Sequence, residues 1–324
     1  SAWLVGELAI IHLVLQLGLT SVLAFIGLFD DSLAQCGLGL FALSWLGLLY
    51  VHIQAQDTSE FTVAALRRAL GENYRDAIPS ERRALLVDSI SSRHWLRPFH
   101  FKREGVRVER HISYGNAGTR NLLDLYLPVD PPVAPRPVLL QVHGGAWIIG
   151  SKEEQAKPLM YHMSQRGWLC VSINYRLSPD ATFPAHIIDV KKAIAWIRQN
   201  IAEYGGDPGF IAITGGSAGG HLSSLAALTP NRNEWQPEFE DIDTSVQAAL
   251  PFYGVYDFLD RHDIRAEMAL DKFLAERVMQ CTRDDNPELW HKASPLSHIN
   301  PEAPPCYVIQ GTHDSLVWVE EARA

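Results

Sequence analysis

Residues 213–222 of the chain read ITGGSAGGHL and place one serine among four glycines, directly after an apolar run. Gly215-Gly216-Ser217-Ala218-Gly219 fits G-x-S-x-G, the pattern of a nucleophilic serine on a sharp strand-to-helix turn. On such a turn, side chains two positions before and after the serine would collide, and glycine removes the collision. A Gly-rich turn at a helix start can instead bind phosphate. The pattern alone therefore leaves a nucleophile and an anion site open.

A serine hydroxyl needs help before it can attack an ester. It requires a base, an acid that orients the base, and amide donors for the negative oxygen that develops. The segment HGGAW at 143–147 follows the strand-like run PVLLQV and presents the N–H groups of Gly144 and Gly145 without side chains in the way. The N–H of Ala218 would join them as an oxyanion hole. The alternative for Gly144 and Gly145 is an ordinary turn that closes a strand.

The orienting acid is expected at Asp314, at the end of the apolar run CYVIQGTHD. The chain order Ser…Asp…His of this class of hydrolase places the acid after a later strand of the sheet. Asp257, in FYGVYD after the preceding strand-like run, is the competing candidate. We prefer Asp314 because its strand is the second one after the serine turn.

The base is missing from the expected place. The chain order requires a histidine after residue 314, and the sequence has none there. His313, His221 and His143 each have a structural interpretation: the first points away from the acid, the second packs on the helix after the serine, and the third braces the glycine turn. Two explanations remain, that the catalytic histidine lies beyond residue 324 or that the protein is an inactive hydrolase.

Strand-like and helix-like segments alternate from residue 106 onward. Near-continuous apolar strands separated by crossover helices predict an α/β fold with a mostly parallel, doubly wound sheet. Ligands bind outside the carboxyl ends of such strands, where the residues named above fall. The expected strands are an antiparallel pair at 106–115 and 121–128, then 137–145, 168–176, 209–216, 246–254 and 305–314, with helices near 153–166, near 185–203 and from 218.

Composition excludes several classes of protein. The net charge is −9, and no basic stripe interleaved with aromatic residues occurs, so nucleic-acid binding is disfavoured. The four cysteines are far apart and form no C-x-x-C pair, so neither a disulfide framework nor a zinc site is indicated. No cofactor and no metal are expected.

Two apolar segments precede this region, at 8–29 and 33–53, each near the ~20 residues that cross a bilayer. With the polar DDS turn between them they predict a transmembrane helical hairpin within residues 1–56. His12 and Gln16 would lie inside the membrane, and we interpret them as partners in a helix–helix hydrogen bond. A signal peptide is the competing interpretation of the first segment. Lys and Arg are absent before Arg67, so the positive-inside rule places the remainder of the chain in the cytoplasm.

Residues 57–104 are predicted to be a connector with two amphipathic helices. TSEFTVAALRRAL is expected to begin with a Thr58/Ser59 cap and to end at Gly71, and SERRALLVDSI is expected to begin at Ser80. A membrane-surface platform, an entry lid and a plain solvated linker all fit this pattern. Residues 105–324 then form the catalytic domain, which we expect to be truncated at its C-terminal end.

The segments HGGAW, INYRLSPDATFPAHIIDVKKAIAWI, GGSAGG and APPCYVIQGTHDSLV together resemble the α/β-hydrolase superfamily, and within it the esterases like hormone-sensitive lipase and arylacetamide deacetylase. The resemblance covers about residues 105–324. It implies Ser217 as nucleophile, Asp314 as acid, and Gly144, Gly145 and Ala218 as oxyanion donors. The sequence departs from the family where HGGA replaces HGGG, where Gly216 replaces a common acidic residue, and where the histidine falls outside the chain.

We therefore predict a membrane-tethered serine carboxylesterase or lipase that acts on small or lipid-derived esters through an acyl-enzyme on Ser217. Two alternatives remain open. One is a hydrolase of another bond, similar to an arylformamidase or a peptidase, and the other is a non-catalytic binding protein of the same fold. An assay of ester hydrolysis with and without the serine separates these classes.

Overall fold

The computed structural model describes residues 8–83, 86, 101–263, 265 and 269–324. The chain divides into two compact units, Ser1–Ser89 and Ile90–Ala324. The predicted division into a hairpin at 1–56, a connector at 57–104 and a catalytic domain from 105 stays a prediction.

In the first unit, helices α2 (Ala9–Phe25) and α3 (Ser32–Gln56) pack against each other. The hydroxyl of Ser44 donates to Oε1 of Gln16 across the pair, at 3.3 Å. The helix–helix hydrogen bond expected for Gln16 is confirmed. In the turn between the helices, the carboxylate of Asp31 accepts the N–H of Ala34 at 2.8 Å and caps α3.

Length and composition identify one candidate membrane span in the described residues, where the sequence predicts two. It is the helical run Ser32–Leu70, whereas Ala9–Phe25 has only 17 residues. The run is this long because α4 (Thr58–Leu70) follows α3 through Asp57, which is itself in the right-handed helical region. The predicted Thr58/Ser59 cap is therefore wrong.

Helix α4 ends at Gly71, as predicted, with φ of +93°. The 3₁₀ turn η1 (Tyr74–Ala77) and helix α5 (Ser80–Arg83) follow. Most of the remainder of the second predicted connector helix lies outside the described residues.

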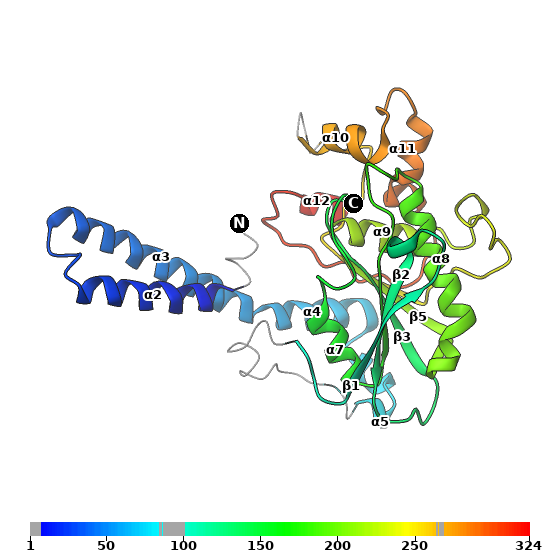
Figure 1. Ribbon diagram of the computed structural model, residues 1–324, viewed down its shortest axis with the longest axis horizontal. Helices are drawn as coiled ribbons and strands as arrows, with labels where there is room; N and C mark the ends of the chain where they lie inside the picture. Colours follow the sequence, from blue (N-terminus) through cyan, green and yellow to red (C-terminus); the bar gives the residue numbers. More distant parts are fainter. Residues whose placement is uncertain (1–7, 84–85, 87–100, 264, 266–268) are drawn as a thin grey trace. The chain divides into compact units, whose positions relative to one another are not determined.

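In the second unit, six strands form one mixed sheet in the order β1-β2-β4-β3-β5-β6 (Figure 1). Strands β1 and β2 pair antiparallel, as predicted, and β2 pairs antiparallel with β4. Strands β4, β3, β5 and β6 are parallel, which confirms the mostly parallel α/β prediction. The bounds are β1 (Val106–Ser113), β2 (Leu122–Pro128), β3 (Arg136–Val142), β4 (Leu169–Ile173), β5 (Gly206–Gly216) and β6 (Ala248–Phe252).

The strand predicted at 305–314 is present only as two isolated parallel bridges, which join Cys306 to Ala249 and Ile309 to Phe252. The N–H of Ile309 donates to the carbonyl of Pro251 at 3.0 Å, so this segment still extends the sheet beyond β6. Pro304 and Pro305 stand at the start of this segment and have no N–H to donate to a neighbouring strand.

Helices cover both faces of the sheet (Figure 1). Side chains along each strand alternate between the two faces, so both faces present apolar side chains that the helices bury. Leu139, Cys170 and Ala212 pack with Met160 and Tyr161 of α7 on one face. Their neighbours along the same strands join the larger core with the apolar side chains of α8 and α9. The three helices span Lys157–Gln165 (α7), Ala185–Asn200 (α8) and Ala218–Leu228 (α9).

Short helices occupy the remaining connections. They are the 3₁₀ turns η2 (Gly118–Asn121), η3 (Ile201–Tyr204) and η4 (Asn233–Trp235), helix α10 (Ala269–Phe273), the π-helical turn η5 (Leu274–Met279), helix α11 (Pro287–Ala293), the 3₁₀ turn η6 (Pro295–His298) and helix α12 (Val319–Arg323).

A buried ion pair ties the segment after β3 to the sheet. The ammonium of Lys152 lies 2.7 Å from Oδ1 of Asp124 on β2, and both side chains are almost fully buried. The backbone of Lys152 is fixed as well, because its N–H donates to Asn174 at 2.7 Å and its carbonyl accepts from Ser172 at 2.9 Å. The loop that follows β3 is thus held at its far end.

Replacing Lys152 by Met is expected to reduce the free energy of unfolding by about 3 kcal/mol, because Asp124 would remain buried without its closest cation. Urea unfolding would measure the change. Lys272→Met is the matched control, since Lys272 and Glu276 form an exposed pair at 3.8 Å whose loss should cost less than ~1 kcal/mol. Equal effects of the two variants would contradict a structural role for the buried pair.

Candidate active site

Ser217 stands at a sharp turn between β5 and α9. Its backbone has φ of 56° and ψ of −120°, a region that a residue with a side chain rarely adopts. Two bonds hold it there: the N–H of Ser217 donates to the carbonyl of Phe252 at 2.9 Å, and its carbonyl accepts the N–H of His221 at 2.9 Å. The residue is half-buried, and its hydroxyl has no hydrogen-bond partner among the described residues.

The glycines around Ser217 are required by close backbone contacts. A Cβ atom on Gly215 would lie 2.5 Å from the carbonyl oxygen of Gly219, and one on Gly219 would lie 2.1 Å from that of Val142. No Cβ tolerates such distances, so the predicted steric reason for the two glycines is confirmed.

The turn after β3 touches the serine turn directly, because a Cβ atom on Gly144 would lie 2.5 Å from the carbonyl oxygen of Gly216. The amide of Gly144, however, already donates to Oε1 of Gln155 at 2.8 Å. The amides of Gly145 and Ala218 have no partner in the described part of the chain.

The amide of Ala146, which is not among the predicted oxyanion donors, is equally unpartnered among the described residues. The HGGA motif contained the signal, because its fourth residue presents an N–H in the same turn. Ala146 itself has φ of 52°, so this turn is strained as well.

Further contacts fix the turn. The hydroxyl of Tyr175 donates to the carbonyl of His143 at 3.1 Å. The N–H of Ser178 donates to the carbonyl of Trp147 at 2.8 Å. The guanidinium of Arg120 donates to the carbonyl of Gly150 at 3.1 Å. These bonds leave little freedom for the unpartnered amides, which is the preorganisation that an oxyanion hole requires.

Asp314 follows the segment that extends the sheet beyond β6. Its Oδ1 accepts the N–H groups of Leu316 at 2.9 Å and Val317 at 3.0 Å, and its Oδ2 accepts Nε2 of Gln310 at 3.1 Å. The side chain is half-buried. The carboxylate is therefore held firmly by neighbours that carry no charge.

Asp257, the competing acid, has a different environment. It is buried, and its Oδ1 accepts Nη1 of Arg261 at 2.8 Å and the hydroxyl of Ser294 at 3.0 Å. Its Oδ2 accepts the N–H of Arg261 at 2.7 Å. These partners occupy the carboxylate, which favours a structural role.

The three histidines near the motifs have other partners. Nδ1–H of His143 donates to the carbonyl of Gly144 at 2.7 Å, and its ring stacks on Tyr175. His221 accepts Nε1–H of Trp147 at 3.2 Å and donates to the carbonyl of Ala293 at 2.8 Å.

The third, His313, is exposed, and its Nδ1 lies 3.3 Å from the hydroxyl of Thr312. Burial lowers the pKa of His143 and of His221 to about 4. Both rings are therefore neutral near neutral pH, and their bonds suit the bracing role expected of them.

One group of side chains has the spacing of metal ligands. It consists of His111, Asp124 and Glu153. The ammonium of Lys152 lies 2.7 Å from Asp124, 3.0 Å from Glu153 and 3.2 Å from His111. It takes the place that a metal ion would need, so this group does not fit a metal site.

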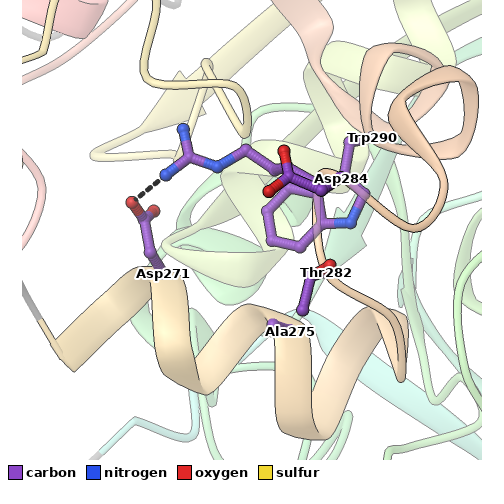
Figure 2. A pocket seen from close by; sticks show the side chains of 6 residues that line it. Asp271, Ala275, Thr282, Asp284 and Trp290 are labelled. Atoms are coloured by element: carbon purple, nitrogen blue, oxygen red, sulfur yellow. Dashed lines mark hydrogen bonds and ion pairs between the residues drawn. The ribbon is translucent and has the colours of Figure 1, made fainter.

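A hollow of about 480 Å³ lies elsewhere in the second unit, along α10, η5 and α11 (Figure 2). Two of the charged side chains of its wall are paired: Arg283 bonds Asp271, and its guanidinium also lies over the ring of Trp290. None of the residues discussed above as catalytic lines it. The lining residues are Asp271, Ala275, Thr282, Arg283, Asp284 and Trp290.

Replacing His221 by Phe should destabilise the protein by about 2–4 kcal/mol near neutral pH, because the Trp147 donor and the Ala293 carbonyl lose their partner. The folded-state pKa of His221 is about 4, against an ordinary 6.5. Unfolding therefore takes up a proton between these values, and the wild type loses stability as the pH falls through this window. The variant should show a slope smaller by up to about 1.4 kcal/mol per pH unit.

Urea unfolding at several pH values would measure this slope, with the exposed His313→Ala as control. An unchanged slope in His221→Phe would contradict the buried neutral ring.

A family model, curated relatives and solved structures were compared with this chain, and all three match it. Residues 123–324 match the family model BD-FAE. "Probable carboxylic ester hydrolase LipM" of Mycobacterium tuberculosis is 48% identical over 284 residues, which are 87% of this chain and 65% of that protein. "Esterase LipQ" of the same organism is 44% identical over 296 residues, 89% of this chain and 66% of that protein. The chain thus spans slightly less than two thirds of the length of these relatives.

Among solved structures, "Thermogutta terrifontis esterase 2 phosphonylated by sarin" is 28% identical to this chain, with a TM-score of 0.58. The match covers 68% of this chain and 78% of the Thermogutta chain. The resemblance expected from the motifs is confirmed, and the second unit has the α/β-hydrolase fold. The chain belongs to the BD-FAE family.

Proposed function

We propose that the protein is a serine carboxylic ester hydrolase with Ser217 as its nucleophile. The observation that carries the proposal is the strained backbone of Ser217, which leaves a half-buried, unpartnered hydroxyl next to a fixed turn with unpartnered amides. The names of LipM and LipQ and the phosphonylation of the Thermogutta esterase support the same chemistry.

In the proposed reaction, Oγ of Ser217 attacks the ester carbonyl and gives its proton to a base. The carbonyl oxygen becomes negative and accepts hydrogen bonds from the N–H groups of Gly145 and Ala218. The N–H of Gly144 or of Ala146 is the third donor. Gly144 can serve only if its bond to Gln155 opens. The C–O bond to the alcohol then breaks, the alcohol leaves with the proton, and water releases the acid from Ser217.

Asp314 is the proposed orienting acid, supported by its position after the last sheet segment and by its uncharged partners. A carboxylate held in this way can accept an N–H from an imidazole and stabilise the imidazolium that forms. That this imidazole belongs to a histidine beyond residue 324 stays a prediction.

We further propose that the first unit anchors the protein in a membrane as a two-helix hairpin. The apolar side chains on the outside of α2 and α3 support this, and Asp30 and Asp31 mark the turn between them. The absence of Lys and Arg before Arg67 supports a cytoplasmic catalytic domain. The exposed large hydrophobic residues of these two helices are Val14, Leu15, Leu17, Leu19, Val22, Phe25, Leu33, Leu40, Leu43, Leu46, Leu49, Tyr50, Val51 and Ile53.

Ser217→Ala in the full-length protein should lower kcat for a p-nitrophenyl ester at least about a thousandfold, because the acyl-enzyme cannot form. Ser223→Ala is the matched control: the hydroxyl of Ser223 is buried on helix α9, which follows Ser217, and has no partner among the described residues, so its loss should be harmless. Retained hydrolysis in Ser217→Ala would refute the assignment. A chain that cleaves formamides or peptides in preference to esters would favour the other hydrolase class instead.

The hairpin can be tested in sealed vesicles that contain the full-length protein with Ser32→Cys in a Cys36→Ser background. A membrane-impermeant maleimide should reach residue 32, at the turn, from one side only, and the exposed Cys306 from the other side only. Labelling of both residues from the same side would contradict two spans.

A further inference from the structure

Two exposed apolar side chains border the serine turn. Ile149 is 65% exposed and Tyr253 is 40% exposed. Single apolar residues on a surface are common, but these two lie against the backbone of the two turns that form the proposed active site.

Glycine contacts fix both positions. A Cβ atom on Gly145 would lie 3.1 Å from Cγ1 of Ile149, and a Cβ atom on Gly216 would lie 3.0 Å from Oη and Cε2 of Tyr253. The turns that contain Gly145 and Gly216 touch each other, as the contact between Gly144 and Gly216 shows. The two side chains therefore lie against the two touching turns that carry the proposed oxyanion donors and the proposed nucleophile.

Tyr253 is held there at a conformational cost. Its φ is 38°, which is unusual for a bulky aromatic residue and marks stored strain. The N–H of Tyr253 donates to the carbonyl of Ile309 at 2.8 Å, and the carbonyl of the preceding Phe252 accepts the N–H of Ser217. The backbone that supports the serine thus also sets the position of the ring.

Gly216 explains how the ring comes so near. Any side chain at this position would meet the ring at about 3 Å, which is closer than most real contacts. The ring of Tyr253 therefore fills the space that a side chain at Gly216 would need. Gly216 is the residue directly before Ser217 in the sequence.

We propose that Tyr253 is a specificity-determining residue, whose ring, together with the side chain of Ile149, binds the apolar substituent of the ester. The inference rests on the proposed function. It favours esters with a ring or a chain of several carbons beside the carbonyl over esters with only small groups, because such a substituent would cover apolar surface that is now exposed to water. The substituent can belong to the acyl or to the alcohol part.

The test uses the full-length protein and two series of esters, one with a fixed alcohol and acyl groups from acetyl to hexanoyl and phenylacetyl, the other with a fixed acetyl group and alcohols from methyl to benzyl. The variants are Tyr253→Ala and Tyr253→Phe, which keeps the ring. Phe210→Ala is the matched control, because Phe210 is an aromatic residue with 39% exposure in the first half of β5, beside Trp168.

Tyr253→Ala should lower kcat/KM about tenfold for the largest substituents in one series and less than about threefold for the smallest ester. The ester series in which the large substituents lose kcat/KM shows whether Tyr253 binds the acyl group or the alcohol group. Tyr253→Phe and Phe210→Ala should both leave the preference of the wild type unchanged.

Gly216→Ala, which pushes on the ring without removing it, should reduce the same preference in the same direction. A loss that is equal for all esters, or no loss in either series, would overturn the specificity role while leaving the hydrolase intact. Absence of hydrolysis of every ester by the wild type would overturn the proposed function, and this inference with it.

Discussion

The arrangement depends on one constraint, the approach of three backbone segments within contact distance around Ser217. The ends of β3, β5 and β6 meet there, with Val142 and Gly144 on one side and Phe252 on the other. Only glycine fits at Gly215 and Gly219, and the serine between them adopts a strained conformation that its two backbone bonds maintain. The surrounding sheet supplies the stability that such strain requires.

The same constraint determines what surrounds the serine. Because the turn after β3 is pressed against the end of β5, Gly144 lies against the serine turn, and the unpartnered amides of Gly145 and Ala146 follow Gly144 directly in the chain. Because the end of β6 holds the N–H of Ser217, the ring of Tyr253 comes to lie over Gly216. We therefore attribute the positions of the proposed nucleophile, of the oxyanion donors and of the ring of Tyr253 to one packing arrangement.

Much of the fold was predictable because apolar runs bounded by glycine and proline give strands and crossover helices their periodicity. The sequence did not reveal that Gln155 occupies the amide of Gly144, or that Tyr253 covers Gly216. Both contacts join residues that are 11 and 37 positions apart, and only the folded chain brings them together. The predicted cap at Thr58 failed because Asp57 adopts a helical conformation between α3 and α4, and local capping preferences do not determine whether two helices join.

The most direct test of the central claim is to treat the full-length protein with an organophosphonate ester and to locate the adduct by tandem mass spectrometry of its peptides. The account predicts a single phosphonyl group on Ser217, blocked by prior incubation with an ester substrate and absent in denatured protein. An adduct on another residue, or full ester hydrolysis with Ser217 unmodified, would contradict it.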